Sequence, residues 1–167
     1  MTKRAIIFID GSNLFHASRK FRQGFKVDFV KLRQALAQEL DLIRAYYYGS
    51  FDPSDMGQQK FHDWLSSNGF EVVIKPLRNR DGKKVEKGAD VGLVTDLISL
   101  GHRNAYDTAI VVSGDADFVK AIKEVKWLGK KVFVASFDAH CAADMRKCSD
   151  GYISLDKISK DIERMVY

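Results

Sequence analysis

Short apolar runs alternate with segments of helical periodicity along this chain of 167 residues. The runs at 5–10, 42–50, 70–76, 106–113 and 131–137, with a weaker one near Tyr152, have the length and β-branched content of buried strands. Strands that alternate with helices predict an α/β fold with a mainly parallel sheet and right-handed crossovers. We therefore expect a sheet of five to six strands.

N-cap residues and glycine stops locate the helices between these strands. Asp28 and Asp55 (or Ser54) are suitable N-caps, because their side chains accept hydrogen bonds from free amides of a first helical turn. The expected helices cover 28–39, 54–68, 90–101 and 118–129, with a last one from Ser154 or Asp156 to the C-terminus. Between Leu77 and Lys87 the alternation stops, and the pair Asp81-Gly82 predicts the tight turn of a projecting hairpin or loop. No linker or repeat divides the chain, so we expect one domain over residues 1–167.

Four aspartates stand at the ends of these elements. Asp10 ends the first strand, Asp115 and Asp117 follow the fourth, and Asp90 begins a helix. Ligands of parallel sheets bind beyond the carboxyl ends of the strands, so these carboxylates should converge. Two such charges at ~4 Å and an effective dielectric of about 20 repel by on the order of 4 kcal/mol. A divalent cation would relieve this repulsion, and hard carboxylate oxygens suit Mg²⁺ or Mn²⁺.

Basic residues surround the acidic phrases. The chain holds 27 Lys and Arg against 22 Asp and Glu, a net charge of +5, which favours a polyanionic partner. Four of the basic residues follow Asp10 and six precede Asp90: Arg19, Lys20, Arg22 and Lys26, then Lys75, Arg78, Arg80, Lys83, Lys84 and Lys87. Acidic side chains at the centre with basic side chains around them are typical of a metal site that binds phosphate groups. A solvated charged face explains the basic residues equally well.

Several other classes of site are excluded by their missing motifs. The chain has neither a P-loop nor a glycine-rich dinucleotide loop after the first strand. Ser12 stands where a haloacid dehalogenase phosphatase carries its second aspartate, and Leu14 breaks an integrin-like metal motif. The four histidines lack ligand or triad spacing, and Cys141 and Cys148 are expected as reduced thiols. The first apolar run is too short for a signal peptide or membrane span, so a cytoplasmic location is expected.

Three motifs together carry a family resemblance. The segments 8–14 (FIDGSNL), 87–91 (KGADV) and 112–118 (VSGDADF) resemble, in order and spacing, the NYN domain, the LabA-like branch of the PIN-like nucleases. The resemblance runs from near Lys3 to about Leu155. It implies a three-layer, Rossmann-like and PIN-like fold with strand order 3-2-1-4-5 and helices on both faces. It also implies a divalent metal and hydrolysis of RNA phosphodiester bonds.

The resemblance also assigns roles to residues. It implies that Asp10, Asp90, Asp115 and Asp117 bind the metal and act in catalysis, with Asn13 as their polar neighbour. Asp96 matches a recurrent further acid, but it lies about 240° round the helix from Asp90, so we expect Asp96, like Ser113, to support the ligands rather than bind the ion.

Contacts to the RNA strand can be assigned only loosely. Ser12 could orient a water or a phosphate oxygen, and the basic residues from Lys75 to Lys87 would grip the RNA backbone. The three tyrosines at 46–48 alternate across a central strand and should pack in the core. Phe21, Phe25 and Phe51 fall in expected loops and are weak candidates for base stacking.

The leading hypothesis is a cytoplasmic, metal-dependent ribonuclease that acts on single-stranded RNA. Two alternatives remain open: a nucleic-acid-binding or regulatory adaptor with a weakly active or inactive PIN-like site, and a small-molecule phosphohydrolase. The intact acids favour the enzyme over the adaptor, and the basic surroundings favour a polymer over a small substrate. Homo-oligomers and protein partners are left open by the sequence.

Overall fold

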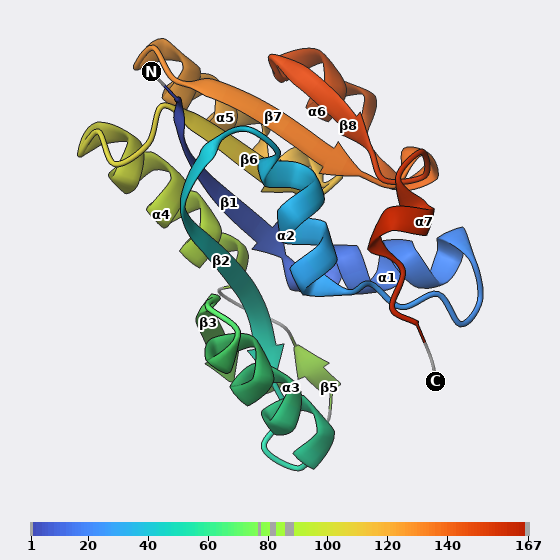
Figure 1. The fold of residues 1–167 in the computed structure, drawn as a ribbon. Helices are drawn as coiled ribbons and strands as arrows, with labels where there is room; N and C mark the ends of the chain where they lie inside the picture. Colours follow the sequence, from blue (N-terminus) through green and yellow to red (C-terminus); the bar gives the residue numbers. More distant parts are fainter. Residues whose placement is uncertain (1, 77, 81–82, 86–88, 166–167) are drawn as a thin grey trace.

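The structure, a computed structural model, describes residues 2–76, 78–80, 83–85 and 89–165 (Figure 1). Its centre is a sheet of six parallel strands in the order β3-β2-β1-β6-β7-β8. These strands are β1 (Arg4–Asp10), β2 (Asp41–Phe51), β3 (Glu71–Pro76), β6 (Thr108–Val112), β7 (Lys131–Ser136) and β8 (Gly151–Ser154). The predicted order is confirmed, and the weak run near Tyr152 is the sixth strand.

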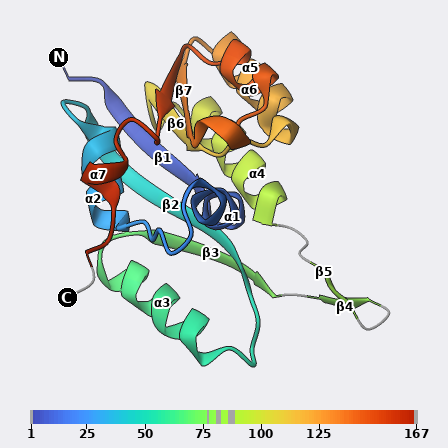
Figure 2. The same ribbon diagram turned by 90° about the vertical axis from the view of Figure 1, so that its right-hand side faces the viewer.

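Helices cover both faces of the sheet, which confirms the three layers (Figure 2). One face packs against α1 (Gly11–Phe21), α2 (Phe29–Ala37), α3 (Met56–Ser67) and α7 (Ser159–Ile162). The other packs against α4 (Ala89–His102), α5 (Val119–Trp127) and α6 (Ala143–Cys148), with the short turn η1 (Ala116–Phe118). A second turn, η2 (Asp138–His140), follows β7.

The two faces explain why the strand runs are apolar without alternation. In β1, Ile7 and Ile9 belong to one core cluster, whereas Ile6 and Phe8 belong to the other. A central strand that buries both of its faces needs apolar side chains at every position. The tyrosines of β2 divide in the same way, with Tyr47 on the α1 face, so their predicted core role is confirmed.

The caps of α2 and α3 are confirmed, but the last helix is not as expected. The Asp28 carboxylate accepts a hydrogen bond from the Lys31 amide at 3.0 Å, and Asp55 caps α3. A helix from 154 or 156 to the C-terminus is wrong, because Ser154 ends β8 and α7 is a single turn. The backbone of Glu163 then bridges to Val27, which commits it to an extended conformation.

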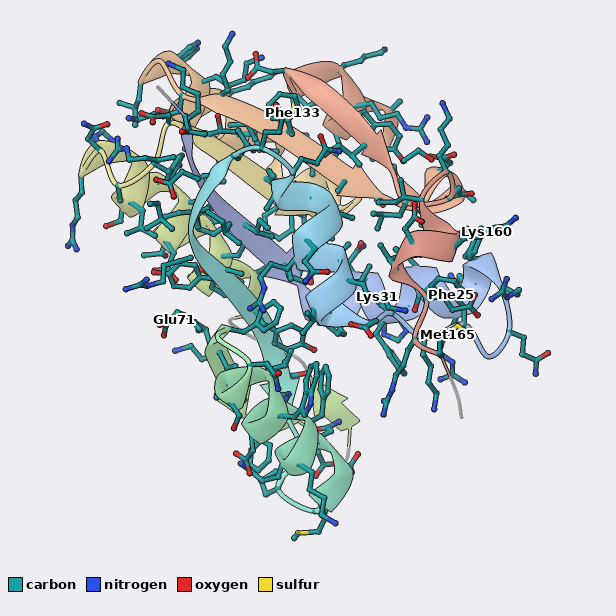
Figure 3. The ribbon with its side chains drawn as sticks, viewed as in Figure 1. Phe25, Lys31, Glu71, Phe133, Lys160 and Met165 are labelled. Atoms are coloured by element: carbon teal, nitrogen blue, oxygen red, sulfur yellow. The ribbon has the colours of Figure 1, made fainter. Side chains whose placement is uncertain are left out.

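Helix α1 was not expected, and it changes the role of the loop phenylalanines. Asp10 caps α1, and Phe21 is its last residue. Phe25 is 2% exposed, and its ring centroid lies 5.3 Å from that of Phe21 and 5.8 Å from that of Phe137 (Phe25 is labelled in Figure 3). Phe51 ends β2. The loop placement of Phe21 and Phe51 is therefore wrong, and the buried Phe25 offers no ring face to a base.

Of the two predicted forms, hairpin or loop, the structure has a hairpin, a separate two-stranded antiparallel sheet; the predicted turn Asp81-Gly82 lies outside the described residues. The hairpin consists of β4 (Arg78–Arg80) and β5 (Lys83–Val85), which pair with each other and project past the end of β3 (Figure 2). Both cysteines carry free thiols, as expected. Among the helices in the described ranges, none is long and apolar enough to cross a bilayer.

Candidate functional site

Asp10 is the centre of the candidate site. It is the last residue of β1, where the apolar run of that strand meets the carboxyl edge of the sheet. Its side chain is only 4% exposed, yet both carboxylate oxygens have donors. The backbone amide of Asn13 donates to Oδ1 at 3.2 Å, and the hydroxyl of Ser113 donates to Oδ2 at 2.9 Å. A buried carboxylate is thus fixed in orientation by two segments of the chain.

The loop after β6 is tied to the start of α1 by the same residues. The side-chain oxygen of Asn13 accepts a hydrogen bond from the Gly114 amide at 3.1 Å. The Ser113 hydroxyl accepts one from the Asp115 amide at 3.1 Å. Ser113 therefore joins Asp10 to the Asp115 loop, and Asn13 lies in the same network. The supporting role of Ser113 stays a prediction.

The electrostatics of Asp10 reflect a concentration of negative charge. Its pKa is raised to about 6, mainly by burial and further by the charges of Asp90 and Asp115, while hydrogen bonds from Asn13 and Ser113 act to lower it. The structure therefore brings Asp90 and Asp115 within electrostatic reach of Asp10, although they come from α4 and from the loop after β6. An added positive charge here would lower the pKa and stabilise the ionised carboxylate.

The remaining acids are less closely gathered. Asp115 is half-buried, and its Oδ1 accepts a hydrogen bond from the Asp117 amide at 2.9 Å, which caps η1. Asp117 is exposed, as is Asp90 in the first turn of α4. In the parts of the chain that the structure describes, no three His, Cys, Asp or Glu side chains form a ready-made metal-binding group. Ligation by four carboxylates stays a prediction.

Asp96 accepts a hydrogen bond from Tyr48, which the sequence predicted only as a core residue. The Tyr48 hydroxyl donates to Asp96 Oδ2 at 2.8 Å. Tyr48 is the register partner of Asp10 in the neighbouring strand, and its side chain packs on the α4 face of the sheet. Burial and the Asp96 carboxylate raise the pKa of Tyr48, so the phenol stays a donor. The hydrogen bond from Tyr48 therefore links Asp96 to the strand that pairs with β1 at Asp10.

The predicted RNA contacts lie around the same edge. Ser12 is partly exposed in the first turn of α1, and Lys75 is exposed near the end of β3. Arg78 and Arg80 lie in β4, and Lys83 and Lys84 in β5. Lys87 lies outside the described residues.

Sequence reasoning also missed the close contact that Gly114 makes. A Cβ atom at this position would lie 1.9 Å from the backbone oxygen of His140. The Gly114 oxygen in turn accepts a hydrogen bond from the Ala142 amide at 3.0 Å. The acidic loop is thus clamped between α1 and the η2–α6 segment. The glycine between Ser113 and Asp115 in the motif was the one available signal.

Comparison with known proteins gives one family. The family model of the NYN domain matches residues 4–156. Low amplitude and bright protein LabA of Synechococcus elongatus is 34% identical, with 96% of this chain and 88% of that protein covered. An uncharacterised protein of Methanocaldococcus jannaschii is 27% identical over 97% of the chain, which spans 60% of that relative.

A solved structure agrees with this assignment. The crystal structure of a protein of unknown function from Vibrio parahaemolyticus superposes with a TM-score of 0.84 at 26% identity, covering 98% of this chain and 97% of that one. Fold and sequence motifs therefore point the same way. The chain belongs to the NYN domain family, a PIN-like nuclease family, and this membership supports a nuclease-type function.

Proposed function

We propose that this chain is a divalent-metal-dependent ribonuclease that hydrolyses phosphodiester bonds of single-stranded RNA. The observation that carries the proposal is the buried Asp10 carboxylate, oriented by Ser113 and Asn13 and subject to the charges of Asp90 and Asp115. Asp10 caps α1, but a cap does not need the charges of Asp90 and Asp115 nearby, so a function is the natural reason for this concentration of negative charge. Membership of a PIN-like nuclease family supports the same reaction class.

The donor set fits Mg²⁺ or Mn²⁺. PIN-like nuclease domains generally use divalent metals, and these ions prefer hard carboxylate oxygens. Asp10, Asp90 and Asp115 would hold the ion with Asp117 as a further ligand, and their carboxylates would have to draw closer to share it. When bound, such an ion supplies an acidified water and neutralises charge on the phosphate oxygens.

The chain's own groups would prepare the substrate for in-line attack by water. Ser113 and the Asn13 amide hold Asp10 in the orientation that its ionised form needs. Ser12 and the Asn13 side chain stand next to Asp10, where they can orient the water or a phosphate oxygen. Lys75 and the hairpin residues would hold the strand by its phosphates. Hydrolysis of this kind leaves a 5′-phosphate and a 3′-hydroxyl.

A time course on end-labelled single-stranded RNA tests the proposal. Cleavage should require Mg²⁺ or Mn²⁺, stop with chelator, and fall by more than about a hundredfold in Asp10→Asn, because the cation loses its most buried ligand. Asp41→Asn is the matched control, since Asp41 is exposed at the start of β2, at the opposite edge of the sheet. Cleavage that survives chelator would contradict the proposal.

The chemical route is tested separately, with one deoxynucleotide at the cleaved position. Attack by water does not need the 2′-hydroxyl, so a cut there with a 5′-phosphate product is expected. A 2′,3′-cyclic phosphate from all-RNA substrate, with no cut at the deoxy position, would instead indicate internal attack by the ribose hydroxyl.

A nucleic-acid-binding adaptor is the second candidate. It is favoured by one observation: the described part of the chain contains no group of three metal-binding side chains already in place. An adaptor would bind the same RNA without metal-dependent cleavage. Binding and cleavage measured on one labelled strand separate the two functions.

A further inference from the structure

We infer that an aromatic groove beside Asp10 binds the unpaired bases of the RNA strand that the proposed nuclease cleaves. The inference rests on the proposed function for the identity of the strand. The groove itself is defined by two adjoining cavities of about 730 and 370 Å³ on the α1 face of the sheet. We call the two cavities together the aromatic groove; the rings in their combined lining include Phe15, Phe29, Tyr47, Phe61 and Trp64.

One end of the groove lies against the catalytic edge. Gly11, the residue after Asp10, lines the larger cavity. A Cβ atom on Gly11 would lie 2.4 Å from the phenol oxygen of Tyr47, so this ring is packed directly against the first turn of α1. A strand with a phosphate at Asp10 would therefore have its neighbouring nucleotides at the mouth of the groove.

The floor of the groove is a set of rings in mutual contact. The centroid of Phe29 lies 5.6 Å from that of Tyr47 and 5.4 Å from that of Phe61. Phe61 and Tyr47 are 5.8 Å apart. Phe61 and Phe29 line both cavities, and Trp64, one turn after Phe61 on α3, extends the lining into the smaller one. The groove thus continues from α1 to α3, which lie on the same side of the sheet (Figure 2).

Two of these rings are open to an incoming base. Phe15 is 55% exposed and Trp64 is 43% exposed, values unusual for aromatic side chains that pack in a core. The Arg19 guanidinium lies over the Phe15 ring, 5.3 Å from its centroid. An aromatic ring with a guanidinium beside it offers stacking to a base and charge to its phosphate at one place.

Charge around the groove favours a polyanion over a neutral apolar ligand. Its lining includes four exposed cations: Arg19, Lys26, Lys60 and Arg164. The one carboxylate in the lining, Asp28, caps α2 through the Lys31 amide. Stacking rings with cations at the rim are the features by which proteins hold single strands without reading their sequence. Paired bases face each other inside a duplex, so only unpaired bases could reach these rings.

Tryptophan fluorescence can report on the groove directly. The chain has two tryptophans, and Trp127, which is 81% exposed, belongs to α5 on the other side of the sheet. Trp127→Phe therefore leaves Trp64 as the single reporter. In chelator, so that the strand stays intact, we titrate this protein with a single-stranded RNA oligonucleotide. The comparison strand has the same phosphates but abasic spacers in place of the nucleosides.

The intact oligonucleotide should quench Trp64 and bind about fivefold or more tightly than the abasic strand, because each stacked base adds affinity. Phe15→Ala in this background should remove most of that advantage and leave abasic binding unchanged. Leu128→Ala, at an exposed apolar residue just after α5, should change neither the affinities nor the quenching. Equal affinity for the two strands, or RNA binding that leaves Trp64 fluorescence unchanged, would overturn the inference.

Failure of this inference can be told from failure of the proposed nuclease. If Phe15→Ala cleaves RNA at the wild-type rate in the presence of metal, and RNA does not quench Trp64 in the Trp127→Phe protein, the nuclease proposal stands and base binding in the groove is contradicted. Base-dependent quenching without cleavage in any metal would keep the groove and make the chain an adaptor. No quenching by any oligonucleotide would remove the groove whatever the activity.

Discussion

The acidic site and the basic hairpin stand at the same edge of the sheet and are built in opposite ways. Asp10 ends a central buried strand, and its carboxylate is held by donors from two other segments. The hairpin strands β4 and β5 pair only with each other among the described strands and project from the sheet. Groups that carry out chemistry must be placed to within a fraction of an ångström, whereas attraction between charges acts over about 8–10 Å. The difference in construction follows the difference in task.

Among the predicted changes, substitution of Gly114 should have the largest effect, because it disturbs the precisely built acidic site. A methyl group there would sit 1.9 Å from the His140 backbone oxygen, so the acidic loop or the η2–α6 segment must move. We expect Gly114→Ala to lower the free energy of unfolding by about 2–4 kcal/mol and to abolish activity. Chemical denaturation and the cleavage assay measure both.

A second glycine gives the matched control. In α4, a Cβ on Gly92 would make ordinary contacts of 3.6 Å or more with Tyr48 and Val73. Gly92→Ala should therefore be stabilising by about 0.5–1 kcal/mol, because alanine loses less backbone entropy in a helix. If Gly114→Ala were as stable as Gly92→Ala, the acidic loop would tolerate an added side chain, and it would not be the precisely packed region described above.

The ionised carboxylate of Asp10 should lower the free energy of unfolding at neutral pH. Its folded pKa of about 6 lies above the unfolded value near 3.9, so the folded state holds this proton more tightly. Stability is therefore lost as pH rises from about 4 to about 6, and the full penalty of roughly 2–3 kcal/mol remains above that. In chelator, Asp10→Asn should be more stable than wild type at pH 7 and lose this advantage near pH 4. Thermal or urea unfolding across this range measures the difference.

Asp138 provides a control of opposite sign. Burial acts to raise its pKa, but hydrogen bonds from the Tyr152 and Ser154 hydroxyls, together with the charges of Arg146 and Lys157, leave it lowered. Its stabilisation is present above the unfolded pKa and lost as pH falls. Asp138→Asn should therefore be less stable than wild type at pH 7, with a smaller deficit in acid. The same sign for Asp10→Asn would contradict the assignment of Asp10.

Tyr48→Phe tests whether Asp96 acts through support alone. Loss of the 2.8 Å hydrogen bond should cost about 1 kcal/mol of stability. Metal-dependent cleavage should fall far less than in Asp10→Asn. Tyr106→Phe is the matched control, because its buried hydroxyl donates to the Leu97 oxygen of the same helix at 2.6 Å. A loss of activity in Tyr48→Phe as large as in Asp10→Asn would make Asp96 a ligand.

The sheet could be read from the sequence because central strands that bury both faces leave runs such as Ile6–Ile9 with no polar interruption. Helix α1 could not. Its first turn carries Ser12 and Asn13, which are weak helix formers, and the carboxylate that caps it also ends the preceding strand. The length of the last helix was likewise decided by tertiary contacts, since the backbone of Arg164 pairs with Lys26.

The acids of the site were predictable as residue types at strand ends, but their arrangement was not. The bond from Ser113 to Asp10 spans 103 positions of the chain. Tyr48 was predicted only as a core residue, and the glycine of the motif does not reveal that Gly114 lies against the His140 backbone oxygen. The lining of the aromatic groove comes from α1, α2, β2, α3 and the segment after α7. Sequence spacing reveals neighbours on one element, and such a surface needs the assembled fold.

The smallest effect is expected from substitutions in the basic hairpin. Lys83→Ala with Lys84→Ala removes two charges from β5 and should change the free energy of unfolding by less than about 0.5 kcal/mol. Affinity for single-stranded RNA should fall, and the slope of log affinity against log salt should flatten by up to about 1.4, or ~0.7 for each phosphate released. Measurement of affinity at several salt concentrations, in chelator, gives both quantities.

A charge-matched control decides what the hairpin does. Lys123→Ala with Lys131→Ala removes the same charge from α5 and from the start of β7, away from the acids, and should leave the slope unchanged. If both double variants lower affinity and slope equally, the hairpin contributes only net charge. If neither affinity nor slope changes in the hairpin variant, its lysines are a solvated face. A large loss of cleavage rate at unchanged salt slope would instead mean that the hairpin positions the scissile bond, and the contrast between a precise and a tolerant region at this edge would fail.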